Sequence, residues 1–293
     1  MRGRYAPSPT GRLHLGNLRT AVLAWLFARA AGSEFRVRME DLDQGRVQAG
    51  SAERQLADLA ALGTDWDGPV VFQSHRHDAY ESAIARLQAG GRLYECFCTR
   101  AEIRAAASAP HGPLPEGAYP GTCLRLTAAQ RERKRAGGRA PALRVRAEGA
   151  RVAFTDRLHG AREGVVDDFV VRRNDGVPAY NLAVVVDDAW QEVEEVVRGD
   201  DLLESTPRQR FLAGLLDLPA PATAHVPLVL GPDGARLAKR HGAVTLGEVE
   251  PGDAVAWMAA SLGLAEARSA GALLDGFDPA ALPRAATRFT GIR

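Results

Sequence analysis

Apolar residues near the start of the chain follow two different spacings. Residues 35–39 (FRVRM) alternate apolar and polar side chains as a β-strand does, and residues 2–6 (RGRYA) are expected to form a second short strand. Between them, residues 18–32 (LRTAVLAWLFARAAG) repeat their apolar side chains at helical spacing and end at a glycine. This order predicts a β-α-β unit.

The same two spacings continue further along the chain. A helix is predicted over residues 50–62, with Ser51 as its cap, and another over 76–90. Strands alternate again with helices over residues 165–190 and 194–216, and the chain beyond His241 is rich in Ala and Leu at helical spacing. We therefore expect an α/β fold with a short helical C-terminal region.

Residues 96–164 interrupt this pattern. They hold all three cysteines, the Pro- and Gly-rich stretch APHGPLPEGAYPGTC and the basic stretch AAQRERKRAGGRA. We interpret them as an inserted α+β subdomain. The predicted division is 1–95 and 165–242 for the two halves of the main α/β domain, 96–164 for the insertion and 243–293 for the helical C-terminal region.

Composition narrows the class of protein. The chain has 293 residues, of which 46% are hydrophobic and 25% charged, as expected for a globular protein with a buried core. Its 37 basic and 36 acidic residues nearly cancel, so a polyanionic partner needs a local basic patch. No signal peptide or membrane-length apolar run is present, and we expect a cytoplasmic monomer.

The stretch APSPTGRLHLGN, residues 6–17, leads from the first strand into the first helix. A helix N-terminus entered through glycine can bind phosphate with its backbone N–H groups. His14, Gly16 and Asn17 lie at this point, and the His14 ring could donate a hydrogen bond to a phosphate oxygen. The alternative is a simple turn in which His14 caps the helix.

Four stretches in order decide between these interpretations. Residues 4–21, 37–46, 180–209 and 226–243 resemble the motifs of the glutamyl branch of the class I aminoacyl-tRNA synthetases, with HLGN in place of the first signature and RLAKR in the mobile loop. The resemblance implies a Rossmann-like parallel sheet that binds ATP with Mg²⁺, and L-glutamate.

The resemblance also implies roles for single residues. Arg4 and Ser8 would bind the side-chain carboxylate of glutamate, and Glu40 its ammonium group, although Glu40 could instead belong to an acidic turn. Tyr180 and Arg198 match the amino-acid pocket. His14, Gly16, Asn17 and Lys239 match the ATP site, where His14, Asn17 and Lys239 would be catalytic. The mobile loop departs from the family pattern at Arg236 and Ala238.

The cysteines are odd in number and lie close together in sequence. In a cytoplasmic protein, Cys96, Cys98 and Cys123 point to structural zinc rather than to a disulfide. The residue two positions after Cys123 is not the histidine that some family members have. His111 is one candidate for the fourth ligand; Tyr119 is preferred, because it resembles the phenolate ligand of smaller relatives. Free cysteines in a small core are the alternative.

Only about fifty residues follow the mobile loop, so the helical anticodon-binding region of the longer family members is not expected. The short chain resembles members that activate glutamate without tRNA and attach it to the queuosine base at the first anticodon position of tRNA(Asp). Basic residues at 131–135 and 171–174 would contact the anticodon loop. Alternatives are a truncated enzyme charging tRNA(Glu), a silent paralogue that binds tRNA or glutamate, and another adenylating enzyme.

Overall fold

A computed structural model of the chain describes residues 1–99, 101–103, 118–241 and 244–292. It begins with the predicted β-α-β unit: β1 (Gly3–Tyr5), α1 (Leu15–Ala30) and β2 (Phe35–Met39). The two strands are parallel, with Gly3 beside Phe35 and Tyr5 beside Val37. The predicted α/β fold class is confirmed.

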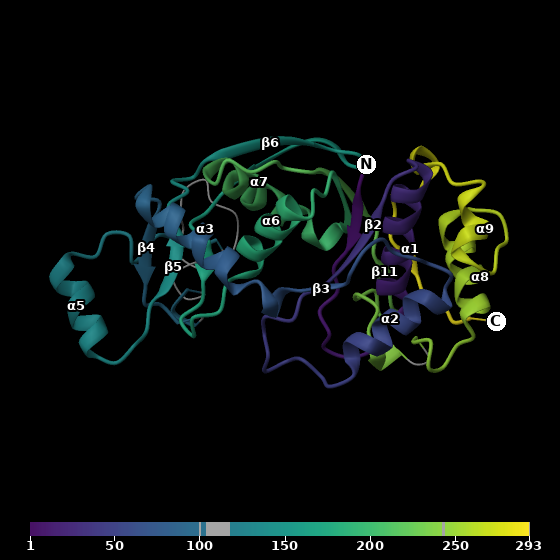
Figure 1. Ribbon diagram of the computed structural model, residues 1–293, viewed down its shortest axis with the longest axis horizontal. Helices are drawn as coiled ribbons and strands as arrows, with labels where there is room; N and C mark the ends of the chain where they lie inside the picture. The colour runs from purple at the N-terminus through teal and green to yellow at the C-terminus, as the bar shows by residue number, and fades with distance from the viewer. Residues whose placement is uncertain (100, 104–117, 242–243, 293) are drawn as a thin grey trace.

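Helix α1 is the centre of the largest hydrophobic core. Its apolar side chains are buried on almost all sides, which is typical of a helix enclosed between layers rather than lying on a surface. The sheet covers one side and the C-terminal helices cover the other (Figure 1). These are α8 (Pro251–Leu262) and α9 (Ala270–Leu274), which confirm the predicted helical character of the last segment.

Parallel strands from both halves of the chain make up the catalytic sheet. In one group the order is β1-β2-β3, with β3 at Val71–Phe72. In the other the order is β7 (Gly160–Val165), β6 (Arg151–Asp156), β10 (Ala222–Val226) and β9 (Glu195–Gly199), with β7 antiparallel. The carbonyl of Arg2 accepts hydrogen bonds from the N–H groups of Glu194 and Glu195 at 2.9 and 3.2 Å, so the start of β9 lies beside β1.

A smaller antiparallel sheet lies at the other end of the molecule (Figure 1). It has the order β4 (Leu93–Cys96), β5 (Ala142–Val145) and β8 (Val170–Arg172), and the exposed helix α5 (Ala128–Ala136) extends from it. By contrast, β6 and all but the last residue of β7 also fall within 96–164, and they extend the catalytic sheet, β6 beside β10 and β7 beside β6. The predicted domain boundaries at 96 and 164 stay predictions.

The expected helices 50–62 and 76–90 are present, but Ser51 does not cap the first of them. Gly50 is the N-cap residue, and the Ser51 hydroxyl instead accepts from the N–H of Gly11 and donates to its carbonyl, both at 2.9 Å. Gln55 donates to the same carbonyl at 2.7 Å, so this helix braces the loop after β1. The two helices are α2 (Ser51–Ala61) and α3 (His77–Ala89).

Further helices, one strand pair and several 3-10 helices complete the described part of the chain. Within the described ranges, no helix is long and apolar enough to cross a membrane. The elements are α6 (Tyr180–Trp190), α7 (Thr206–Leu215), the strand pair β11 (Val229–Leu230) and β12 (Thr287–Arg288), and 3-10 helices at Gln73–His75, Asp200–Ser205, Lys239–His241 and Pro279–Ala281.

Candidate active site

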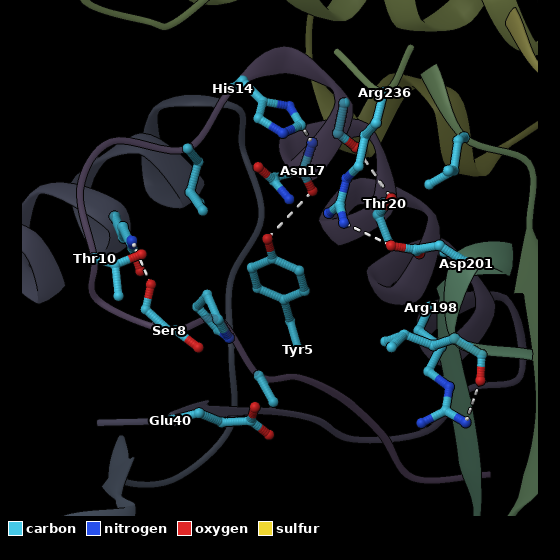
Figure 2. A pocket seen from close by; sticks show the side chains of 18 of the residues that line it. Tyr5, Ser8, Thr10, His14, Asn17, Thr20, Glu40, Arg198, Asp201 and Arg236 are labelled. Atoms are coloured by element: carbon cyan, nitrogen blue, oxygen red, sulfur yellow. Dashed lines mark hydrogen bonds and ion pairs between the residues drawn. The ribbon is translucent and has the colours of Figure 1, made fainter. Parts of the chain in front are cut away.

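A cavity of about 600 Å³, called here the main cavity, lies where β1, β2 and β9 end and α1 begins. Ligands of open α/β sheets bind at this carboxyl edge. His14 and Asn17 lie at one end of the cavity, and Glu40 and Arg198 at the other (Figure 2). The main cavity brings together eight residues predicted for the site: Arg4, Ser8, His14, Gly16, Asn17, Glu40, Tyr180 and Arg198.

His14 is the N-cap residue of α1. Its Nδ1 accepts a hydrogen bond from the backbone N–H of Asn17 at 3.2 Å. A neutral imidazole that accepts at Nδ1 carries its proton on Nε2, so the same ring keeps a donor group. The sequence offered a helix cap and a phosphate donor as alternatives. The structure shows the cap, and the cap is compatible with the donor role, which stays a prediction.

The N-terminus of α1 offers fewer open N–H groups than expected. The N–H of Leu15 donates to the carbonyl of Val244 at 2.7 Å, and that of Asn17 is bound by His14. In the described part of the chain, the N–H of Gly16 has no hydrogen-bond partner. A Cβ on Gly16 would lie 3.1 Å from the His14 ring and 3.3 Å from Cβ of Val229, so close packing also requires this glycine.

The loop after β11 contributes a further cation to the cavity. Arg236 pairs through Nη1 with Oδ2 of Asp201 at 2.5 Å (Figure 2), and both side chains are partly exposed. The predicted tight turn is present, with Gly234 at a φ of 77° and its N–H bound to the carbonyl of Gly231. Lys239 begins a 3-10 helix, and its side chain lies outside what the structure describes.

Charged groups surround Arg4 beneath the other end of the cavity. Nε of Arg4 lies 3.3 Å from Oδ1 of Asp188, and Nη1 of Arg38 lies 2.8 Å from the same oxygen. Asp187, next along α6, accepts from Nε of Arg76 at 2.6 Å. We call this set the Arg4 side: Arg4, Arg38, Glu40, Asp187 and Asp188.

Glu40 lies at the edge of this set, directly after β2. Its Oε1 is 3.5 Å from Nη2 of Arg38, and its side chain is 11% exposed. Burial raises the pKa of Glu40 above its ordinary value, with Arg38 and Arg4 opposing the shift. A carboxylate held in the cavity wall in this way suits a ligand ammonium group. Glu40 is buried in the cavity wall, whereas Asp43 lies at the surface in a pair with Arg173 at 3.3 Å; the role of Glu40 stays a prediction.

Arg198 is held in a different manner. Its Nε donates to Nε2 of His225 at 3.0 Å, Nη1 donates to Oε1 of Gln209 at 2.8 Å, and Nη2 donates to the hydroxyl of Thr206 at 2.9 Å. Nη2 also lies 3.3 Å from the carbonyl of Leu202 (Figure 2). These acceptors are all neutral, and no carboxylate among the described residues lies within ion-pair distance. Burial lowers the pKa of Arg198.

The sequence did not indicate the partners of the predicted residues. Asp188 and Arg38 sit in stretches that resemble the family but have no distinctive spacing, and His225 is one polar residue in the strand ATAHV. Arg236 was recognised only as a departure from the family loop, although it lines the main cavity. An arginine that replaces a loop lysine was the one available signal.

The three cysteines meet as predicted, and Tyr119 joins them. Their sulfur atoms all lie within 4.8 Å of one another, with Cys98 and Cys123 3.4 Å apart. The Tyr119 hydroxyl lies 3.4 Å from the sulfur of Cys96 and 3.7 Å from that of Cys98. Ligands of one tetrahedral zinc at about 2.3 Å lie roughly 3.8 Å apart, so these residues could hold zinc. His111 lies outside the described residues.

A second cavity of about 750 Å³, the side cavity, adjoins the main one. The wall opposite the main cavity is formed by the small sheet and the cysteine cluster. It includes Cys96, Cys98, Arg144 and, directly after β8, Arg173. A ligand in the main cavity can therefore be approached from the side of the insertion. Four residues line both cavities: Ser8, Glu40, Arg46 and Tyr180.

Known proteins show similarity over nearly the whole chain. Residues 1–258 match the model of the family "tRNA synthetases class I (E and Q), catalytic domain". The chain is similar to a "Glutamyl-Q tRNA(Asp) synthetase" of Nocardia farcinica, with 62% identity over 96% of this chain and 91% of the relative, and to one of Symbiobacterium thermophilum, with 56% identity over 83% and 79%.

Solved structures agree with the sequence relatives. A glutamate tRNA ligase from Elizabethkingia meningosepticum, solved in complex with its amino acid, is 26% identical and superposes with a TM-score of 0.83. The similarity covers 99% of this chain and 67% of that structure. With a family match over residues 1–258 and close relatives over most of its length, this chain belongs to the class I tRNA synthetases of the E and Q group.

Proposed function

We propose that this chain activates L-glutamate with ATP, independently of tRNA, and transfers the glutamyl group to the queuosine base at the first anticodon position of tRNA(Asp). The main cavity carries this proposal. It holds two arginines and a buried carboxylate at one end and a helix N-terminus with a further arginine at the other. Relatives named glutamyl-Q tRNA(Asp) synthetase align with most of the chain, which favours this acceptor.

The end of the cavity that contains Arg4 and Arg198 would bind glutamate. Glu40 would pair with the substrate ammonium group, while Arg4 and Arg198 flank a carboxylate, with Ser8 and Tyr180 beside them. Within the described ranges, the side chain of Arg4 contacts Asp188 through Nε, which would leave its terminal nitrogens for a ligand. Arg198 lacks a carboxylate partner among the described residues, so a substrate carboxylate would balance its charge.

The reaction would then occur between the two ends. The α-carboxylate of glutamate attacks the α-phosphorus of ATP and forms a new oxygen–phosphorus bond. The bond between the α-phosphorus and the bridging oxygen breaks, and pyrophosphate leaves with that oxygen and the electron pair of the bond. His14, Gly16 and Asn17 would bind phosphate oxygens, and the cations of the loop, Lys239 and Arg236, would stabilise the leaving group. Mg²⁺ bound with ATP supplies additional charge neutralisation.

The acceptor would enter through the side cavity. A hydroxyl on the cyclopentene ring of queuosine attacks the carbonyl carbon of glutamyl-adenylate, an ester forms, and AMP leaves. Unstacked bases of an RNA loop suit a cavity of this kind. Arg173 lines it, and Arg131, Arg133 and Lys134 lie on the exposed helix α5, where they could contact phosphates. Such binding would weaken with added salt.

Two measurements test this function. Glutamate-dependent exchange of pyrophosphate into ATP without tRNA tests activation, and labelled glutamate tests transfer to tRNA(Asp) with queuosine, tRNA(Asp) without it, and tRNA(Glu). We expect exchange, and label only on the queuosine-containing tRNA, in the anticodon fragment after nuclease digestion. Label at the 3′ end of tRNA(Glu) would identify a truncated enzyme of that type, and no exchange at all would support a silent paralogue.

The cysteine cluster with Tyr119 is proposed to bind one structural zinc. Zinc would tie the end of β4 to the chain around Cys123 and so shape the side cavity. Zinc content measured by elemental analysis should be equimolar, should be lost in Cys98→Ser, and should be more easily removed by a chelator in Tyr119→Phe. Chelation should reduce transfer to tRNA more than pyrophosphate exchange. Protein without zinc that keeps full transfer would favour free cysteines.

A further inference from the structure

Three neighbouring parallel strands carry one connected row of polar side chains. Asp156 ends β6, His225 lies in β10, and Arg198 lies in β9 directly beside His225 in the strand register. Oδ2 of Asp156 is 2.6 Å from Nδ1 of His225, and Nε2 of the same ring is 3.0 Å from Nε of Arg198. Asp156 and His225 are almost completely buried and do not line the main cavity.

The hydrogen bonds fix the protonation state of the ring. A guanidinium nitrogen can only donate, so Nε2 of His225 must present a lone pair to Arg198. The proton of the neutral ring then lies on Nδ1, where it donates to Asp156. The backbone N–H of His225 also donates to Asp156, at 3.2 Å, and the Thr206 hydroxyl lies 3.3 Å from Nε2. The state required by Arg198 is therefore the one that Asp156 stabilises.

We propose that Asp156 and His225 are positioning residues that hold the guanidinium of Arg198 in the orientation that receives the carboxylate of glutamate. This inference rests on the proposed function for the identity of the ligand. The row itself, and the tautomer that it requires, do not depend on that function.

The use of a neutral ring has a chemical consequence. A carboxylate in place of His225 would orient Arg198 equally well, but it would also neutralise the positive charge of the guanidinium, which attracts the substrate carboxylate. The imidazole orients the guanidinium and leaves its charge in place. Asp156 carries the negative charge one ring further away, beyond the hydrogen-bond reach of Arg198.

Two substitutions of the same buried residue separate the two functions of the ring. The amide of asparagine reaches the place of Nδ1, so His225→Asn keeps a donor for Asp156 and loses the acceptor for Arg198. The amide of glutamine reaches the place of Nε2, so His225→Gln keeps that acceptor. In pyrophosphate exchange, His225→Asn should raise the KM for glutamate about 10-fold, which is the effect of one lost hydrogen bond to a charged group. The kcat and the KM for ATP should change by less than about 3-fold.

His225→Gln should keep its KM for glutamate within about 3-fold of the wild type, whatever its loss of stability. Asp156→Asn should resemble His225→Asn, because the ring is then free to turn its proton toward Arg198. The control is His159→Asn, because Nε2 of His159 contacts only the backbone carbonyl of His225, at 3.1 Å. Its KM for glutamate should not change. Equal KM values in His225→Asn and His225→Gln would overturn the proposal.

A spectroscopic measurement keeps the proposal testable if the variants do not fold or the proposed function fails. In the two-bond ¹H–¹⁵N spectrum of histidine-labelled wild-type protein at neutral pH, one buried ring, assigned as His225 through a Thr206→Ala perturbation, should show a protonated Nδ1 and an unprotonated Nε2. A proton on Nε2 would overturn the proposal. Absence of pyrophosphate exchange with the expected tautomer would overturn the proposed function alone.

Discussion

Arg4 and Arg198 reach the same cavity from neighbouring strands, and both are buried, with 4% and 5% of their surfaces exposed. Their surroundings are opposite in kind. The Arg4 side contains three carboxylates, one of which contacts both Arg4 and Arg38. Arg198 is surrounded by an imidazole, a hydroxyl, an amide and a backbone carbonyl.

The difference separates stability from binding. Burial alone would lower the pKa of Arg38, but the nearby carboxylates of Asp188, Glu40 and Asp187 outweigh it and raise that pKa. For Arg198 burial prevails, and its pKa is lowered. A cation whose charge is balanced inside the protein contributes to a closed network, and a cation whose charge is not balanced is poised for an anionic ligand. Arg38 thus belongs to a closed network that also holds Arg4 through Asp188, whereas Arg198 lines the main cavity with no carboxylate at ion-pair distance among the described residues.

The largest expected effect follows from removal of the shared carboxylate. Asp188→Asn leaves Arg4 and Arg38 buried without their common partner and should lower the free energy of unfolding by about 3 kcal/mol or more, measured by urea denaturation. The matched control is Asp201→Asn, which removes a partly exposed partner of Arg236. A similar loss in both variants would contradict the distinction between the Arg4 side and an ordinary surface pair.

The Arg198 side can be made to resemble the Arg4 side by one isosteric change. Gln209→Glu places a carboxylate against Nη1 of Arg198, where the amide oxygen now lies at 2.8 Å. Repulsion of the substrate carboxylate should raise the KM for glutamate about 30-fold, or about 2 kcal/mol. The change also removes the amide N–H that Gln209 donates to Oδ1 of Asn181 at 3.1 Å. Gln209→Met, which adds no charge, should have a smaller effect on KM. Equal effects would show that the charge of the new group is irrelevant.

His225 beside Arg198 and Asp188 beside Arg4 should titrate in separate pH windows. Burial lowers the pKa of His225 from 6.5, so as the pH falls the unfolded chain takes up this proton before the folded protein does. The contribution of neutral His225 to stability is therefore complete above pH 6.5 and is lost as the pH falls from there through the pKa of the folded state. Despite burial, Arg4 and Arg38 lower the pKa of Asp188 from 3.8, so its stabilisation is lost only below that pH.

Unfolding measured from pH 7 to pH 3 in the wild type and two variants tests this order. His225→Gln should flatten the dependence just below pH 6.5, by at most about 1.4 kcal/mol per pH unit, and Asp188→Asn should flatten it only below pH 4. If both variants flattened the pH dependence of the free energy of unfolding over the same pH range, the two groups would not titrate separately.

The smallest effect on stability is expected at the end of the main cavity that contains Arg236. The pair of Arg236 and Asp201 is half exposed, so Asp201→Asn should change the free energy of unfolding by less than about 1 kcal/mol, and the change should shrink in 1 M salt. The effect of Asp188→Asn should persist in salt, because that group is buried. Equal salt dependence in the two variants would remove the contrast between them.

The spacing of apolar residues and the ordered motifs predicted much of this architecture. The β-α-β unit, the later alternation of strands and helices, and the eight residues of the main cavity follow from local patterns and from the resemblance to the family. The meeting of the three cysteines was also predicted, because they are close in sequence and chemically alike.

The remaining features depend on contacts that no local pattern contains. His225 contacts Arg198, 27 positions away, only because β9 and β10 pair in one particular register. The hydroxyl of Ser51 binds the backbone of Gly11 rather than its own helix, because the loop after β1 folds onto α2. The pairing of β6 with β10 depends equally on tertiary contacts, which strand spacing cannot supply.

The placement of β6 limits how this chain can be recombined. In sequence, β6 lies within residues 96–164, after the cysteine cluster; in space, it belongs to the catalytic sheet and ends in Asp156. A chimera that took residues 96–164 from a relative would also replace β6 and the Asp156 carboxylate that contacts His225, whereas a junction before Arg151 would leave that strand native. Residues 96–164 are therefore not an exchangeable cassette, because one strand of the catalytic sheet lies inside them.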